Sequence, residues 1–389
     1  MDHGLWSIGP GSEPEVVTAT LLTGCVIRRC VNHEISLPNF QVSKSTLLIL
    51  LGLGIYLAYL RHLGLGEVAE SLGDVNLTLF FAALVFSLMM VAFNAFSWRR
   101  VAEELDCGCG PSLRDLFLIY LSSIFMNNLL PSGGFSGETA RIYFLSKIEG
   151  GSRFDASFAS VAASRIITAV PFIFGMVLGL AYLMFRYQVP GWALTTCFAM
   201  TVLTVSVGFL FVGICFEERW LQRMVGFAVK PFERIFHREL DPEVCSGAVS
   251  GFLMNMLLLR HNSRALLESF AWAFAGWLCL EAVAFASFRS LGVEVTPLAI
   301  FAVYSVIVVF QTLPLGLPGG VGLVEILMTA LFFAVGVSIY DAAAVTILIR
   351  LVQLWFLALL GGFSTVHLMR RIERDKTGRE TVRLHGIRI

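Results

Sequence analysis

Six apolar stretches in this chain approach the roughly 17 to 25 residues that an α-helix needs to cross a lipid bilayer. They cover residues 46–61, 77–98, 156–185, 191–216, 266–288 and 342–366. The composition agrees, because 57% of the residues are hydrophobic and only 14% are charged, whereas about a quarter of the residues of a soluble domain carry charge. We therefore expect an all-α polytopic membrane protein with six full transmembrane helices.

Lysine and arginine are distributed unevenly about these stretches. Three of the 28 basic residues fall in loops on one side, namely Arg61, Arg186 and Arg289, and three fall inside apolar segments, namely Arg141, Arg165 and Arg350. All the others fall on the opposite side, which the positive-inside rule assigns to the cytoplasm. Because six spans return the chain to its starting side, we expect both termini in the cytoplasm and the protein in the cell membrane.

A motif of Leu-Pro, several glycines and a Glu occurs twice, at residues 130–138 and 317–325. Each copy follows an apolar run, 115–130 or 298–313, that is shorter than the six predicted spans. Interrupted segments in matching positions of two halves mark the binding site in many transporters. The duplication therefore indicates a two-part site built by an internal repeat.

The loops around each motif predict its orientation. Residues 115–146 have basic loops on both sides, so this segment enters and leaves from the cytoplasm as a re-entrant hairpin with its tip near Pro131. Residues 298–337 lie between two outer loops and form a hairpin that enters from outside, with its tip near Pro318. Two opposed re-entrant Pro-Gly hairpins form an inverted-topology repeat, and their tips are expected to meet near the bilayer midplane.

A buried arginine follows each hairpin. Arg165 comes after Asp155, where its helix starts at the inner surface, and Arg350 comes after Asp341, where its helix starts at the outer surface. At about 1.5 Å per residue, both arginines lie about 14 to 15 Å deep in a hydrocarbon layer about 30 Å thick. They are expected to reach the same plane from opposite faces.

Arginine at this depth requires partners or water, and irregular backbone there must line a cavity or be buried in protein. Arginine forks and free helix N-terminal amides both favour phosphate, so we expect a polar cavity for an anionic lipid headgroup. The predicted headgroup ligands are Arg141, Arg165, Arg350, Gly133, Gly134, Gly319 and Gly320, with Glu138 and Glu325 as ion-pair or coupling residues, Asn127, Asn128 and Gln311 lining the cavity, and Pro131 and Pro318 at the hairpin tips. We expect no metal ion, no cofactor and no nucleic acid, and membrane lipids with anionic headgroups as partners.

A structural interpretation of these residues stays open. Glu and Arg can form an ion pair whose only role is to hold two hairpins together, and Pro-Gly runs can be simple turns. Glu281, alone within a predicted span, is compatible with lining the cavity or with hydrogen bonding to a neighbouring helix.

The chain divides into five regions on this interpretation. They are a poorly ordered cytoplasmic segment (1–44), a first membrane half (45–216) with hairpin 115–146, a cytoplasmic linker (217–265), a second membrane half (266–368) with hairpin 298–337, and a basic cytoplasmic tail (369–389). Within the linker, residues 219–236 alternate aromatic and basic side chains in a pattern typical of an amphipathic helix on anionic lipid.

Several of these residues also follow the pattern of a known family. They are Trp98, Arg99, Asn128 to Pro131, Gly137, Glu138, Arg141, Tyr143, Leu145, Arg165, Pro318 to Gly322, Glu325, Arg350, Trp355 and Gly361. Over roughly residues 45 to 368, the chain resembles the lysylphosphatidylglycerol synthase transmembrane-region family of flippase-like membrane proteins. It departs from the family pattern at Ser164, where many members carry an acidic residue, and so Arg165 lacks an acidic neighbour in sequence.

This resemblance implies a role in moving lipids or lipid-linked intermediates between leaflets. Some members join the region to a soluble aminoacyl-transferase, but this chain ends at Ile389, so we expect no such domain and a transporter, not an enzyme. The leading hypothesis is a flippase or scramblase for a phospholipid or a polyprenyl-phosphate-linked intermediate. The alternatives are a membrane-embedded headgroup transferase, or a non-catalytic partner of a lipid-modifying or glycosylation enzyme.

Overall fold

The fold was analysed in a computed structural model, which describes residues 39–105, 112–130, 135–148, 154–186, 242–312 and 317–386, and single positions between 202 and 219. Apart from short connections, the continuously described parts are helical and contain no strand. The expected all-α class is therefore confirmed for the described part of the chain.

The helices differ greatly in length. In chain order they are α2 (Asn39–Leu63), α3 (Leu65–Ser71), α4 (Leu77–Glu104), α5 (Leu113–Leu129), α6 (Phe135–Ile148), α7 (Phe154–Arg186), α10 (Pro242–His261), α11 (Ser263–Ser290), α12 (Pro297–Thr312), η1 (Pro318–Gly320), α13 (Leu323–Ala334), α14 (Ile339–Arg350), η2 (Leu351–Phe356) and α15 (Leu357–Gly386). Here η1 is a 3-10 turn, and η2 is a π-helical segment that joins α14 to α15 without a break.

Five helical segments within the described residues are long and apolar enough to cross a membrane. They are Thr46–Leu63, Leu77–Glu104, Ala156–Arg186, Ser263–Ser290 and Ile339–Asp375. These segments coincide with five of the six predicted spans. The remaining predicted span, 191–216, and the predicted amphipathic segment 219–236 lie almost wholly outside the described residues, as does the N-terminal segment up to residue 38. The chain is thus an integral membrane protein.

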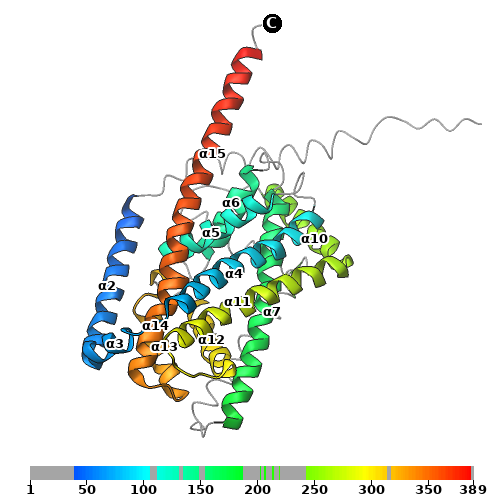
Figure 1. The fold of residues 1–389 in the computed structure, drawn as a ribbon. Helices are drawn as coiled ribbons and strands as arrows, with labels where there is room; N and C mark the ends of the chain where they lie inside the picture. Colours follow the sequence, from blue (N-terminus) through cyan, green and yellow to red (C-terminus); the bar gives the residue numbers. More distant parts are fainter. Residues whose placement is uncertain are drawn as a thin grey trace, which may run out of the picture.

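Helices α4 and α11 pack along each other in opposite directions at the centre of the bundle (Figure 1). Ser97 near the end of α4 hydrogen bonds to Ser269 near the start of α11, at 2.9 Å. At the other end of the pair, the Asn76 amide donates to the carbonyl of Ser290. Between them Gly276 lies against Asn94, because small residues allow helix axes to approach closely within a membrane.

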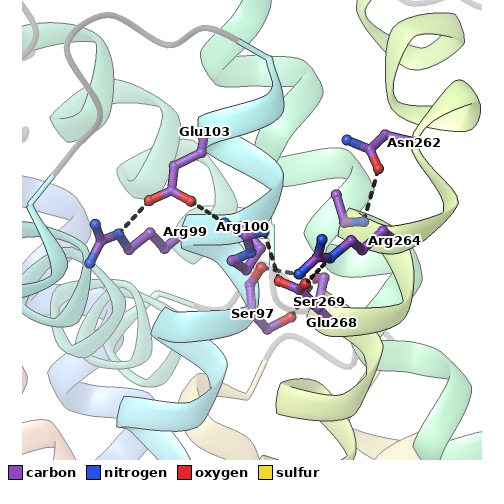
Figure 2. A network of polar contacts seen from close by, with 9 residues as sticks. Ser97, Arg99, Arg100, Glu103, Asn262, Arg264, Glu268 and Ser269 are labelled. Carbon is purple, nitrogen blue, oxygen red and sulfur yellow. Dashed lines mark hydrogen bonds and ion pairs between the residues drawn. The ribbon is translucent and has the colours of Figure 1, made fainter.

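An ion-pair network joins the end of α4 to the start of α11 (Figure 2). Arg100 contacts both Glu103 and Glu268 at 2.7 Å, and Arg264 contacts Glu268 at 2.9 Å. The same end carries the Asn262 side chain, which accepts from the amide of Ala265 and caps α11. This ion-pair network lies on the side of the membrane that the sequence assigns to the cytoplasm.

The long helices that follow α6 and α13 each pack against a short helix from the opposite half of the chain. Helix α7 runs antiparallel to α12, with Gly179 against the backbone of Ala302 and Tyr182 accepting from Thr296. Helix α15 runs antiparallel to α5, with Gly361 against the Leu121 carbonyl. In Figure 1, α5 and α6 occupy the upper half of the bundle, and α12 and α13 the lower half. The two halves are thus interlocked by matching contacts.

Helix α10 lies in the region 217–265, which the sequence analysis treated as a linker. Its apolar face packs against α7, where Phe252 contacts Phe158 and Met256 is fully buried. This segment is apolar over Ser250–Leu259, which is fewer residues than a helix needs to cross a bilayer.

Candidate functional site

The first motif lies where α5 ends and α6 begins, and Asn127 links the two helices. Asn127, near the end of α5, accepts hydrogen bonds from the Gly137 amide at 2.6 Å and from the Ser136 hydroxyl at 3.2 Å. A Cβ on Gly137 would lie 2.6 Å from the Ser123 carbonyl, so only glycine allows α6 to approach α5 this closely. Asn127 therefore fixes the start of α6, and with it the position of Glu138 one turn later.

Glu138 lies near Arg165 on α7, and the two side chains form a loose, partly exposed ion pair. Its Oε1 lies 3.6 Å from Nε of Arg165, and the two side chains are 21% and 53% exposed. Its other oxygen, Oε2, has no hydrogen-bond partner among the described residues. Arg165 lies within α7, a candidate membrane span, so its exposed guanidinium must face water, lipid headgroups or another polar ligand.

Arg141 lies on α6 one turn beyond Glu138 and is buried. Its Nη2 donates to the Ser164 hydroxyl at 3.0 Å. Its guanidinium lies 4.1 Å from the ring centre of Trp98 and 5.0 Å from that of Tyr120, and aromatic faces attract such cations most strongly where water is excluded. The Ser164 hydroxyl thus provides a hydrogen-bond acceptor for Arg141.

These three groups leave an excess of positive charge. Glu138 carries one negative charge, whereas Arg141 and Arg165 carry one positive charge each, and all three lie close enough to interact electrostatically. The Nε of Arg141 has no hydrogen-bond partner among the described residues. We call this group, with Asn127 at its edge, the α6 cluster. Its composition suits an anion with several acceptor oxygens.

The second motif forms a buried ion pair between Glu325 and Arg350, which also bond to the glycine turn. Glu325 Oε1 accepts from Arg350 Nε at 2.6 Å, and its Oε2 accepts from the Gly322 amide at 2.6 Å. Nη2 of Arg350 donates to the carbonyl of Gly319 at 2.7 Å. The Arg350 and Glu325 side chains are 8% and 5% exposed. Their charges cancel, and the pair clamps the turn of η1 to the end of α14.

The turn of η1 also touches the first motif. Asn128 lies next to Gly319, so η1 contacts the end of α5. Gly319, Gly320 and Gly322 all have positive φ, at 58°, 64° and 90°, a backbone region that disfavours residues with a Cβ. The structure therefore brings the second Pro-Gly turn against the last turn of α5.

The remaining predicted site residues are scattered. Pro318 is buried and begins η1, and Gln311 is exposed in the last turn of α12. Pro131, Gly133 and Gly134 lie outside the described residues.

Comparison with known proteins places the chain in a family. The model of the lysylphosphatidylglycerol synthase transmembrane region matches residues 45–361. The chain belongs to this family. A UPF0104 membrane protein of Methanothermobacter thermautotrophicus is 27% identical, covering 82% of this chain and 94% of the relative. Similar proteins of Pyrococcus horikoshii and Methanocaldococcus jannaschii are 24% and 23% identical, covering 82% and 87% of this chain and 96% and 99% of the relatives.

The family match includes every described residue of the α6 cluster, and also Glu325 and Arg350.

Tyr120 contacts Arg141 in the structure but was absent from the sequence predictions. Tyr120 belongs to α5, Trp98 to α4 and Arg141 to α6, so three separate helices supply this aromatic cradle. Sequence spacing carries no information about such a contact. An unpaired arginine within an apolar segment is the one feature that indicates the need for a nearby aromatic or polar partner.

Proposed function

We propose that this protein is a lipid flippase or scramblase, and that it passes the phosphate headgroup of a phospholipid or a polyprenyl-phosphate-linked intermediate through a polar cavity at the α6 cluster. The observation that carries the proposal is the half-exposed Arg165 in a spanning helix, beside a buried second arginine and a single carboxylate. A phosphate approaching Arg165 accepts two parallel hydrogen bonds from its guanidinium and replaces the loose contact with Glu138. The buried Arg141 attracts the phosphate electrostatically without contacting it.

The two predicted ion pairs have different roles in this proposal. Arg165 and Arg141, with the backbone of Gly133 and Gly134, bind the headgroup. Arg350 and Glu325, with Gly319 and Gly320, hold the hairpin tips together, because both Glu325 carboxylate oxygens and the Nε and Nη2 atoms of Arg350 are already engaged within the motif. The contact between Glu138 and Arg165 is therefore the one that opens when a headgroup binds.

The proposed topology has six spans, both termini in the cytoplasm, and two opposed re-entrant hairpins at 115–146 and 298–337. It is supported by the antiparallel packing of α4 and α11, which hold corresponding positions before the two motifs. The matching contacts of α7 with α12 and of α15 with α5 are those expected when two inverted repeats interlock. Contact between η1 and α5 agrees with tips that meet inside the bilayer.

Reconstitution tests this function. Purified protein is placed in vesicles that contain fluorescent phosphatidylglycerol, and a membrane-impermeant quencher reports the leaflet of the label. We expect Arg165→Ala to lower the translocation rate about tenfold or more, because a charge-assisted hydrogen bond contributes about 1.5 to 3 kcal/mol. Arg186→Ala, at the end of the same helix, is the matched control and keeps the wild-type rate.

Equal rates for Arg165→Ala and wild type, in variants that unfold at the same temperature, would contradict the proposed site. Metal-dependent chemical turnover of the lipid would favour a headgroup transferase instead. Translocation that appears only after a lipid-modifying or glycosylation enzyme is co-purified would favour a non-catalytic partner.

A further inference from the structure

Glu281 is a buried acid in α11 that the headgroup site does not use. Its side chain is 5% exposed, and Oε2 has no hydrogen-bond partner among the described residues. A carboxylate in this position would hold a negative charge away from water with no basic partner among the described residues, a situation that proteins avoid by binding a proton. Burial therefore favours the neutral carboxyl group of Glu281.

Within the described part of the chain, no arginine forms an ion pair with Glu281. Arg350, the basic residue of α14, is bonded to Glu325, and Arg165 on α7 lies beside Glu138. Helix α4 has no ionisable side chain between Leu77 and Trp98, and the other ionisable residues of α7, α10 and α14 lie near the ends of those helices. From α12, the ionisable residue is Tyr304, on which Glu281 acts electrostatically.

Tyr304 connects Glu281 to the closed ion pair. It is buried, and its hydroxyl accepts from Gln353 Nε2 at 3.1 Å. Gln353 lies in the π-helical segment η2, which begins directly after Arg350. Single π-helical turns inside longer helices are frequent at functional sites. A charge on Glu281 thus acts on a segment that positions Arg350 and, through it, the turn at Gly319.

We propose that Glu281 is a proton-binding site whose protonation state controls the clamp between Arg350 and the Gly319 turn. In the closed conformation described here the carboxyl group holds its proton. When η2 and α12 move enough to admit water, the group transfers that proton to a water molecule and becomes a carboxylate, and closure requires that it take a proton back. Coupling of this step to lipid movement rests on the proposed function, whereas the proton site itself does not.

Infrared spectroscopy tests the proton site without any assay of transport. Full-length protein in lipid nanodiscs at neutral pH is expected to show the C=O stretch of a protonated carboxylic acid, shifted on transfer to D2O. The band disappears in Glu281→Gln, an isostere of the neutral acid, and persists in Glu138→Gln. A spectrum that Glu281→Gln leaves unchanged would overturn the proposal.

The vesicle assay tests the coupling. With a pH gradient across the membrane, wild type is expected to change its translocation rate severalfold, and Glu281→Gln to translocate at one rate regardless of the gradient. A gradient response that persists in Glu281→Gln, or is absent from wild type, overturns the coupling. If wild type moves no lipid at all while the infrared band is present, the proposed function fails and the proton site stands.

Discussion

The Arg-Glu pairs at the two motifs differ in burial and in the distance between their charged atoms. Glu325 and Arg350 contact at 2.6 Å and are almost fully buried. Glu138 and Arg165 are separated by 3.6 Å, and the arginine is half-exposed. Removing one member of a buried pair leaves an uncompensated charge, whereas an exposed pair contributes little to stability.

Stability measurements on alanine variants separate the two pairs. We expect Arg350→Ala to lower the free energy of unfolding by about 3 to 5 kcal/mol, and Arg165→Ala to lower it by less than about 1 kcal/mol. Denaturant unfolding of the purified variants in detergent measures both values. Equal losses would show that the two pairs have the same structural role.

Arg141 is held by its planar shape as well as by its charge. Lysine keeps the charge but loses the hydrogen bond from Nη2 to Ser164 and much of the contact of the planar guanidinium with Trp98. We expect Arg141→Lys to cost about 1 to 2 kcal/mol of unfolding free energy. Arg99→Lys is the control, because Arg99 is partly exposed and paired with Glu103 on its own helix. A fully stable Arg141→Lys variant would contradict the aromatic cradle.

At the scale of elements, the interlocked helices depend on glycines at their crossings. Gly361 on α15 lies against α5, where an added Cβ would meet the Leu121 carbonyl at 2.3 Å and Phe125 Cβ at 2.7 Å. The adjacent Gly362 has no neighbour nearer than 3.5 Å to such a Cβ. Two neighbouring glycines in one helix therefore face different constraints.

Substitution of these glycines tests the crossing. Gly361→Ala is expected to destabilise the protein by about 1 to 3 kcal/mol, because overpacking displaces α15 from α5. Gly362→Ala is expected to be neutral or stabilising by up to about 1 kcal/mol, since alanine is the better helix former. Thermal unfolding of the two variants compares them directly. The same shift in unfolding temperature for both variants would show that Gly361 is not the point of closest approach between α15 and α5.

At the scale of the whole molecule, the sequence predicts the spans because bilayer thickness fixes their length and apolar character. Five described spans coincide with predictions for this reason. The pairing of α7 with α12 was not predictable, since Gly179 looks like any other glycine in an apolar helix. The difference between Arg165 and Arg350 was also hidden, because local sequence around the two motifs is similar and burial is decided by the helices packed around them.

Cysteine accessibility tests the orientation of the whole molecule. In a background without native cysteines, Gly66→Cys and Glu294→Cys are expected to react with an impermeant maleimide added outside intact cells. Lys147→Cys and Arg264→Cys are expected to react only after the cells are opened. The reverse pattern would show that the orientation is opposite to the predicted one. Outer labelling at both Glu294 and Lys147 would rule out the inverted repeat.

The two motifs have different roles in the proposed mechanism, since the first binds the headgroup and the second holds the hairpin tips together. A structure determined in nanodiscs of phosphatidylglycerol distinguishes these roles. We expect phosphate density against the Arg165 guanidinium, with Glu138 displaced from it and Arg350 still bonded to Glu325. Headgroup density on Arg350 with an intact Glu138–Arg165 contact would contradict this expectation.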